Sequence, residues 1–337
     1  MRMNFLNIIL KPLKVALHKT ASLNNEKYYY QTIIQRLADF YIDFNNGVHE
    51  INDEIFGIVF SKDRAMQLQA LLTSYFNYTK NYSPLSVIYA YSNEQHKQAY
   101  EILKKEFQSF PVSFIIENDF SFQLKEIVKK SGADRLFFMT DDAIFLDYFD
   151  LNNCLQFHPV KNVFSLRLGV DLDYCFAYSK DQILPNFAIQ NFNQTAFLIW
   201  KWKEMTESPD WSYPLSLDGT IFYRKEIEAL LSHISFTSPN SLEAELQLYK
   251  DLFLGRNGIC FSKVKYVNVP CNIVQKEFNN KFNDSHSIEQ LVEYFLQGQR
   301  IDWRKMEGLK APEAQKTIFT FTDSEEVIAS KKTKLTD

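Results

Sequence analysis

Glycine is scarce in this sequence, at 9 of 337 residues. Neither glycine-rich phosphate-binding motif, G-x-G-x-x-G or G-x-x-x-x-G-K-[ST], occurs anywhere in it. Both motifs need glycine because only a residue without a side chain lets the backbone come close to a phosphate group. Their absence argues against a dinucleotide-binding Rossmann domain and against a P-loop NTPase.

Clustered positive charge, paired cysteines and long apolar runs are also missing. The net charge is −4, which argues against a broad nucleic-acid surface and predicts no nucleic-acid partner. The four cysteines form no C-x-x-C pair, so we expect buried free thiols in a reducing compartment. No apolar run is as long as a membrane span and no signal peptide is evident, which together predict a cytoplasmic protein.

The N-terminal stretch leaves two interpretations open. Residues 3–19 mix lysines and a histidine with large apolar residues and contain Pro12. They form either a short interfacial helix, in peripheral contact with the inner face of a membrane, or a poorly ordered arm. Residues 25–45 carry apolar positions at helical spacing, so we expect residues 1–50 to be an N-terminal helical extension.

What the sequence has is a regular alternation of strand and helix patterns. Its hydrophobic fraction of 46% is enough for a sizeable core. Strands are expected at 55–60, 85–91, 112–117 and 135–139, with helices at 65–78, 94–107 and 122–132. Because such connections are right-handed and too long for hairpins, the pattern predicts an α/β fold, a mainly parallel sheet flanked by helices.

The second half of the chain is less regular. Strands are expected at 163–168, 195–202 and 264–269, and helices near 224–233, 241–253 and 287–298. We therefore expect one domain over residues 51–308, with a first half at 51–150 and a variable second half at 151–308. Residues 309–337 are expected to be a polar tail that is partly disordered.

The stretch FFMTDDAIFL, residues 137–146, sets Asp141 and Asp142 side by side between apolar runs. Two adjacent carboxylates repel each other and resist desolvation, so a cation is expected to compensate them. Hard divalent cations such as Mg²⁺ and Mn²⁺ take oxygen ligands, often one or two carboxylates together with substrate phosphates. The alternative is that one aspartate only caps a turn after the strand.

The runs IVFSKDRAMQLQALLTSYF and DRLFFMTDDAIFL, with the strands and helices between them, carry a family resemblance. Over residues 54–147 the chain resembles the nucleotide-sugar-binding half of GT-A fold glycosyltransferases, broadly the family 2 group and its bacterial relatives. The resemblance implies that T-D-D stands for the family's D-x-D motif, with Thr140 in its first acidic position. It also implies a UDP- or GDP-sugar donor and Mg²⁺ or Mn²⁺ bound mainly at Asp142, with Asp141 beside it. We call residues 51–150 the donor half and 151–308 the acceptor half.

Further donor contacts are expected at the ends of two strands. The loop after the first strand holds Ser61, Lys62, Asp63 and Arg64, where the resemblance implies contacts to base, ribose or phosphate. As an alternative, Asp63 and Arg64 simply open the following helix. Asp119 resembles the acidic residue that reads a nucleobase in this fold, and it is equally suited to be a helix N-cap.

In the acceptor half, Glu243 and Asp218 are rival candidates for the general base that deprotonates an acceptor hydroxyl. Glu243 at a helix start also suits the helix dipole, and Asp218 also suits a turn. His286 is a candidate third metal ligand, although a lone histidine near a helix start often has no such role. Sugar contacts are considered for three amides and four aromatic residues, with core packing as the alternative for the tryptophans: Asn268, Asn272, Gln275, Trp200, Trp202, Trp211 and Tyr213.

The function that the resemblance implies is metal-dependent transfer of a sugar from a nucleotide-diphosphate sugar to an acceptor hydroxyl. A glycan or lipid-linked saccharide in surface glycan or polysaccharide synthesis is the acceptor expected by analogy. Two alternatives remain open. One is a nucleotidyltransferase acting on sugar phosphates, although the loop SKDRAMQ lacks the glycines usual there. The other is a non-catalytic binding protein that keeps the fold.

Overall fold

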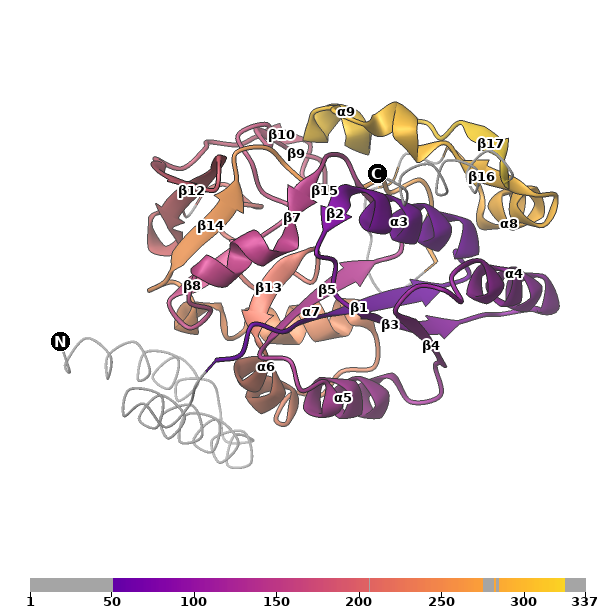
Figure 1. Cartoon of the computed structure of the whole chain (residues 1–337), viewed down its shortest axis with the longest axis horizontal. Coiled ribbons are helices and arrows are strands. Elements are labelled where there is room, and N and C mark those ends of the chain that lie inside the picture. Colours follow the sequence, from indigo (N-terminus) through magenta and orange to yellow (C-terminus); the bar gives the residue numbers. More distant parts are fainter. Residues whose placement is uncertain (1–50, 206, 275–281, 283–284, 325–337) are drawn as a thin grey trace.

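The computed structural model describes residues 51–205, 207–274, 282 and 285–324 (Figure 1). The predicted extension over residues 1–50, with the proposed membrane contact at 3–19, lies outside the described residues. So do Gln275 and the part of the expected tail from residue 325 onward.

A single large sheet forms the centre of the described chain (Figure 1). Its strands are, in spatial order, β11 (Ala188–Phe192), β12 (Thr195–Lys201), β14 (Asn257–Phe261), β8 (Asn162–Ser165), β13 (Thr220–Tyr223), β5 (Arg135–Thr140), β1 (Ile55–Lys62), β3 (Leu85–Ala90) and β4 (Val112–Ile116). Neighbouring strands from β5 to β4 are all parallel, as are β14 and β8, whereas β13, β12 and β11 run antiparallel to their neighbours. The predicted α/β fold with a mainly parallel sheet is confirmed.

Helices cover both faces of this sheet (Figure 1). They are α3 (Ala65–Tyr78), α4 (Glu94–Glu106), α5 (Phe120–Lys130), α6 (Arg224–Leu231), α7 (Pro239–Gln247), α8 (Ile288–Leu296) and α9 (Ala311–Gln315). In Figure 1, α3, α4 and α8 lie above the sheet and α5 and α6 below it. This layering is what parallel strands require, since each crossover helix must pack back onto a face of the sheet.

The helices and strands predicted for the donor half from the local sequence pattern agree closely with the structure. Helix α3 has the predicted bounds, and the other predicted elements up to residue 140 differ from the structure by at most a few residues. The acceptor half differs more. Helix α7 ends at Gln247, where a 3₁₀ turn (Lys250–Leu252) follows, so the helix predicted near 241–253 is too long. Strands β11, β13 and β14 were not predicted, because each is short and gains its regularity from its neighbours in the sheet.

Small two-stranded pairs attach the remaining segments: β2 (Thr79–Lys80) with β7 (Phe149–Asp150), β6 (Ala143–Phe145) with β15 (Tyr266–Asn268), β9 (Tyr174–Cys175) with β10 (Lys180–Asp181), and β16 (Gln299–Ile301) with β17 (Phe321–Asp323). The pair β6–β15 connects the halves directly after the two aspartates. The described residues beyond the expected boundary at 308 continue the packing, because Ala311, Ala314 and Phe319 are buried. The folded region therefore extends to at least residue 323.

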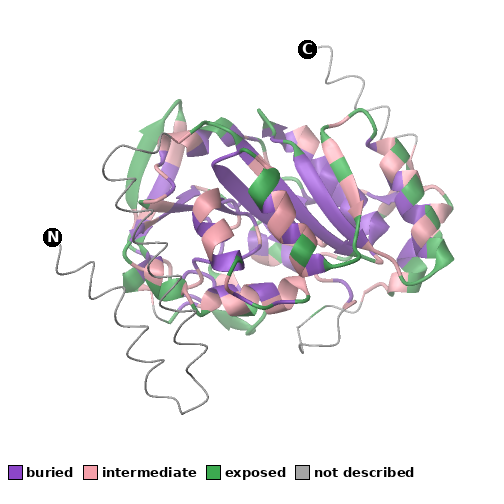
Figure 2. Cartoon of the chain, turned by 90° about the horizontal axis from the view of Figure 1, so that it is seen from below, coloured by how far each residue is buried: buried purple, intermediate pink, exposed green. Residues whose placement is uncertain are grey.

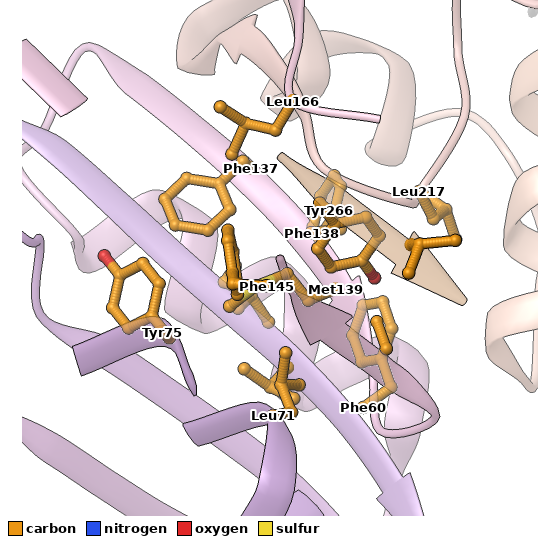
Figure 3. Close-up of a cluster of buried hydrophobic side chains, with 14 of the residues drawn as sticks. Phe60, Leu71, Tyr75, Phe137, Phe138, Met139, Phe145, Leu166, Leu217 and Tyr266 are labelled. Carbon is orange, nitrogen blue, oxygen red and sulfur yellow. The ribbon is translucent and has the colours of Figure 1, made fainter. Parts of the chain in front are cut away.

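The core lies along the central strands, which are mostly buried, while the outer faces of the helices and the edge strand β11 are exposed (Figure 2). Aromatic and aliphatic side chains from β1, α3, β5 and β6 meet there (Figure 3). The tryptophans considered for sugar stacking are also buried. Trp200 packs against both Trp202 and Trp211, so the three belong to the core.

Two further findings concern the cysteines and the length of the helices. Within the described chain, all four cysteines are buried and free, as predicted. Among the described residues no helix is both long enough and apolar enough to cross a bilayer.

Gly258 gives a stability prediction for the acceptor half of the sheet. It pairs with Trp200 across β12 and β14, and a Cβ built on it would lie 2.1 Å from the Trp200 ring. We expect Gly258→Ala to lower the free energy of unfolding by about 1–3 kcal/mol, because overpacking a core forces neighbours to shift. Urea denaturation measures this. In a Trp200→Leu background the same change should cost much less, and an equal cost in both backgrounds would contradict the explanation.

Candidate functional site

The two aspartates lie beside the loop that follows β1. Strands β1 and β5 are parallel neighbours, with Phe60 opposite Thr140, so both strands end at the same edge of the sheet. The Asp141 N–H donates to the Phe60 carbonyl at 3.2 Å. In open parallel sheets ligands bind beyond the carboxyl ends of the strands, which makes this edge the expected site.

Arg64 is the cation that compensates the aspartates in this structure. Its Nη1 donates to Asp141 Oδ1 at 3.1 Å and lies 3.4 Å from Asp142 Oδ2. The other side of the guanidinium donates to Asn272, through Nε to Oδ1 at 2.9 Å and through Nη2 to the carbonyl oxygen. The guanidinium expected to meet a diphosphate is therefore engaged by protein groups, and it links the donor loop to a segment of the acceptor half.

The environments of the two aspartates differ. Asp141 accepts from Arg64 on one oxygen and from the Lys62 N–H on the other at 3.1 Å, and its side chain is 5% exposed. Burial raises the pKa of Asp141 to about 6, and Arg64 opposes that rise. Asp142 is the more accessible, with a side chain 17% exposed. Its Oδ1 accepts from Thr140 Oγ1 at 2.9 Å and from Asn268 Nδ2 at 3.2 Å.

The rest of the donor loop is held by local contacts. The Ser61 hydroxyl lies 2.7 Å from that of Tyr100, and the Lys62 side chain is exposed. Asp63 adopts a left-handed backbone with φ of 56°, and its Oδ1 accepts from the Ser92 N–H at 2.7 Å. A short polar side chain that bonds a nearby backbone group suits this conformation. None of these contacts tests a role in donor binding, which stays a prediction.

Asp218 reaches the aspartates from the acceptor half. Its Oδ1 accepts from Thr140 Oγ1 at 2.8 Å, from Asn268 Nδ2 at 3.1 Å and from the Tyr266 hydroxyl at 3.3 Å. The loop before β13 brings it there, because the Gly219 N–H donates to the Phe138 carbonyl on β5 at 2.9 Å. Burial raises the pKa of Asp218, and the Arg167 guanidinium opposes the rise.

Glu243 lies next to Asp218. It belongs to the first turns of α7, whose N-cap is Ser238. Its Oε1 accepts a hydrogen bond from the Leu217 N–H at 2.9 Å. Burial, and after it the negative charge of Asp218, raises the pKa of Glu243 to about 7. Arg167 opposes this rise and forms an ion pair with Asp210 at 2.7 Å. The acceptor half thus brings two carboxylates and one arginine to the carboxyl end of β5.

Two predicted residues have other neighbours. Asp119 is the N-cap of α5, because its side chain accepts from the Phe122 N–H at 2.9 Å. The His286 ring stacks near Phe319 and meets Phe321 edge-on, while its carbonyl accepts from Asn272 Nδ2 at 3.2 Å. The base-reading role of Asp119 and the metal-binding role of His286 stay predictions.

Several residues of this site were not predicted from sequence. Thr140, Tyr266 and Arg167 contribute a hydroxyl, a phenol and a charge to it. The one available signal was the threonine in place of the first acidic residue of the motif. Arg167 follows a buried strand, but a charge at a strand end is common and does not indicate a site.

The oxygens at this edge fit a hard divalent cation. Asp142 Oδ2 has only the 3.4 Å contact with Arg64, and Asn268 Oδ1 is buried with no hydrogen-bond partner among the described residues. Carboxylate and amide oxygens are what Mg²⁺ and Mn²⁺ take. In the described part of the chain no three His, Cys, Asp or Glu residues gather as a metal cluster, so any such site depends on few carboxylates and on the substrate.

Comparison with known proteins gives one sequence relative and several structures. No protein-family model matches the chain. It is 31% identical over 193 residues to the bifunctional glycosyltransferase pgtA of Dictyostelium discoideum, a match that covers 52% of this chain and 25% of that protein. The chain thus spans about a quarter of the length of this curated relative. The match agrees with the glycosyltransferase resemblance of the sequence.

The similar solved structures include S. aureus TarS, with a TM-score of 0.40 and 16% identity over 63% of this chain and 36% of that chain. TarS 1–349 in complex with UDP has a TM-score of 0.39 and 15% identity, and the match covers 77% of this chain and 68% of that chain. The bifunctional glycosyltransferase WbbM in its apo form has a TM-score of 0.35 and 15% identity, and the match covers 83% of this chain and 50% of that chain.

Proposed function

We propose that this chain transfers a sugar from a nucleoside-diphosphate sugar to an acceptor hydroxyl. The observation that carries the proposal is the meeting of Asp142 and Asp218, through Thr140, at the carboxyl end of β5, with Glu243 beside them. The sequence similarity to a glycosyltransferase supports the same reaction class. A UDP- or GDP-sugar donor, a glycan or lipid-linked saccharide acceptor and a cytoplasmic location are the finer parts of this proposal.

The chain's own residues account for binding and proton transfer. Asp142 would hold Mg²⁺ or Mn²⁺, and the bound cation would stabilise negative charge on the departing diphosphate. Glu243 would accept the proton of the acceptor hydroxyl while that oxygen bonds to the sugar C1 and the bond from C1 to the diphosphate oxygen breaks. A base with a pKa of about 7 suits this step at neutral pH.

Donor binding gives the direct test. We expect one nucleotide sugar among UDP-, GDP- and dTDP-sugars to raise the melting temperature only when Mn²⁺ is present, because a ligand that binds the native state stabilises it. Asp142→Asn should abolish the shift, whereas Asp181→Asn, at an exposed position on β10, should keep it. Release of nucleoside diphosphate in the presence of acceptors then measures transfer.

Other results point to the alternatives. A response to a nucleoside triphosphate together with a sugar phosphate, with release of pyrophosphate, would indicate a nucleotidyltransferase. A full panel without any shift or turnover would contradict the transferase proposal and favour a binding protein.

A further inference from the structure

Thr140 connects two carboxylates with a single proton. Its Oγ1 lies 2.9 Å from Asp142 Oδ1 and 2.8 Å from Asp218 Oδ1, which come from the donor half and the acceptor half. A hydroxyl has one hydrogen to donate, so it can satisfy one of these oxygens at a time. The two carboxylates therefore face each other across one neutral group.

The Asn268 amide reaches the same oxygens. Its Nδ2 lies 2.9 Å from Thr140 Oγ1, 3.2 Å from Asp142 Oδ1 and 3.1 Å from Asp218 Oδ1. An amide nitrogen has two hydrogens for these three acceptors. Its partner oxygen, Oδ1, is buried and accepts no hydrogen bond from the described residues. The donors that bond Asp142 Oδ1 and Asp218 Oδ1 at this point are thus neutral groups. The Asn268 Oδ1 is a further oxygen that a cation could use as a ligand.

The two nearby arginines bond oxygens other than these, although the positive charge of Arg167 also acts on Asp218. Arg64 donates on the other side, to Asp141 Oδ1 and toward Asp142 Oδ2. Arg167 forms its ion pair with Asp210. Both oxygens of Asp141 accept from Lys62 and Arg64, and no hydrogen bond among the described residues joins Asp141 to Thr140, Asn268 or Asp218. The adjacent pair in the sequence is therefore not the pair that converges in space.

We propose that Asp142 and Asp218 together hold the divalent cation, with Thr140 and Asn268 aligning them, while Asp141 serves to anchor Arg64. This inference rests on the proposed function. It assigns the cation of that function to two carboxylates, one from the donor half and one from the acceptor half. It gives a reason for T-D-D, since an aspartate at position 140 would add a third carboxylate where Asp218 already supplies the second. It also leaves Glu243 as the base.

Mn²⁺ binding without turnover tests the assignment. The electron paramagnetic resonance signal of free Mn²⁺ is titrated with the full chain, with and without UDP or GDP. We expect Asp218→Asn and Asp142→Asn each to weaken Mn²⁺ binding at least about tenfold, as loss of a charged ligand should. Asp181→Asn, which removes a carboxylate at an exposed position on β10, should keep the wild-type affinity.

The results separate this inference from the proposed function. If Asp142→Asn loses Mn²⁺ while Asp218→Asn binds it as the wild type does, the inference is wrong and the function stands. If the wild type binds no Mn²⁺ with or without nucleotide, both fail. If Asp218→Asn does not fold, Asp218→Glu is the second variant, because it keeps the negative charge and displaces the carboxylate oxygens. Unchanged Mn²⁺ affinity in Asp218→Glu would contradict the inference. Weaker Mn²⁺ affinity at an unchanged melting temperature would support it.

Discussion

Replacing Glu243 with glutamine should lower kcat by about 10²–10⁴-fold while donor binding stays intact, because general base catalysis typically contributes that much. Glutamine keeps the shape of the side chain and can still accept from the Leu217 N–H, so the fold around Asp218 should persist. Only the ability to take up a proton is removed. Steady-state rates with the donor identified by the melting-temperature panel measure the effect, and the donor's own shift reports binding.

Glu245→Gln is the matched control, since Glu245 lies on the same helix two residues further on. It should keep the wild-type kcat. A Glu243→Gln variant with wild-type kcat would assign the base to another residue, Asp218 being the rival.

The pH dependence of kcat gives the same residue a second test. Burial and the charge of Asp218 raise the pKa of Glu243 to about 7. A base must be ionised to accept a proton, and a cation bound at Asp218 offsets the second cause of this rise, so kcat should rise with pH and level off at or below about 7. In Glu243→Gln the remaining rate should lose this inflection.

Arg64→Met should be the most destabilising of the single changes considered, at about 3–5 kcal/mol in free energy of unfolding near neutral pH. The change leaves the carboxylate of Asp141 buried without its cation, and it leaves Asn272 without the guanidinium that bonds its side chain and carbonyl. Urea denaturation monitored by tryptophan fluorescence measures the loss. Lys62→Met, at an exposed position two residues earlier, should change stability by less than about 0.5 kcal/mol.

The sign of the pH dependence follows from Asp141. Its folded-state pKa of about 6 lies above the value of about 4 for an unfolded chain, so its protonation stabilises the fold at low pH and that contribution is lost as pH rises through 6. Without Arg64 the folded-state pKa rises further. Arg64→Met should therefore lose more stability at pH 8 than at pH 5, and Asp141→Asn in the same chain should recover much of it. An equal loss at both pH values would contradict this account.

The sequence alone determined the layout of the donor half. Strand and helix periods are local properties, so the alternation from β1 to β5 and the full bounds of α3 could be predicted from neighbouring residues. The position of Asp141 and Asp142 at the end of a buried strand was equally local. In the acceptor half the short strand β14, whose five residues include Asn257 and Gly258, has no local signal and forms only because β8 and β12 flank it.

Only the tertiary structure decided which charges meet. Arg64 bonds Asn272, 208 residues away, and Thr140 bonds Asp218, 78 residues away. No period or motif encodes such distances, since they depend on how the two halves fold onto one sheet. The sequence therefore indicated that a cation should compensate the doubled aspartate, while the packing determined that Arg64 bonds Asp141 and also contacts Asp142, and that Asp142 meets Asp218 through Thr140.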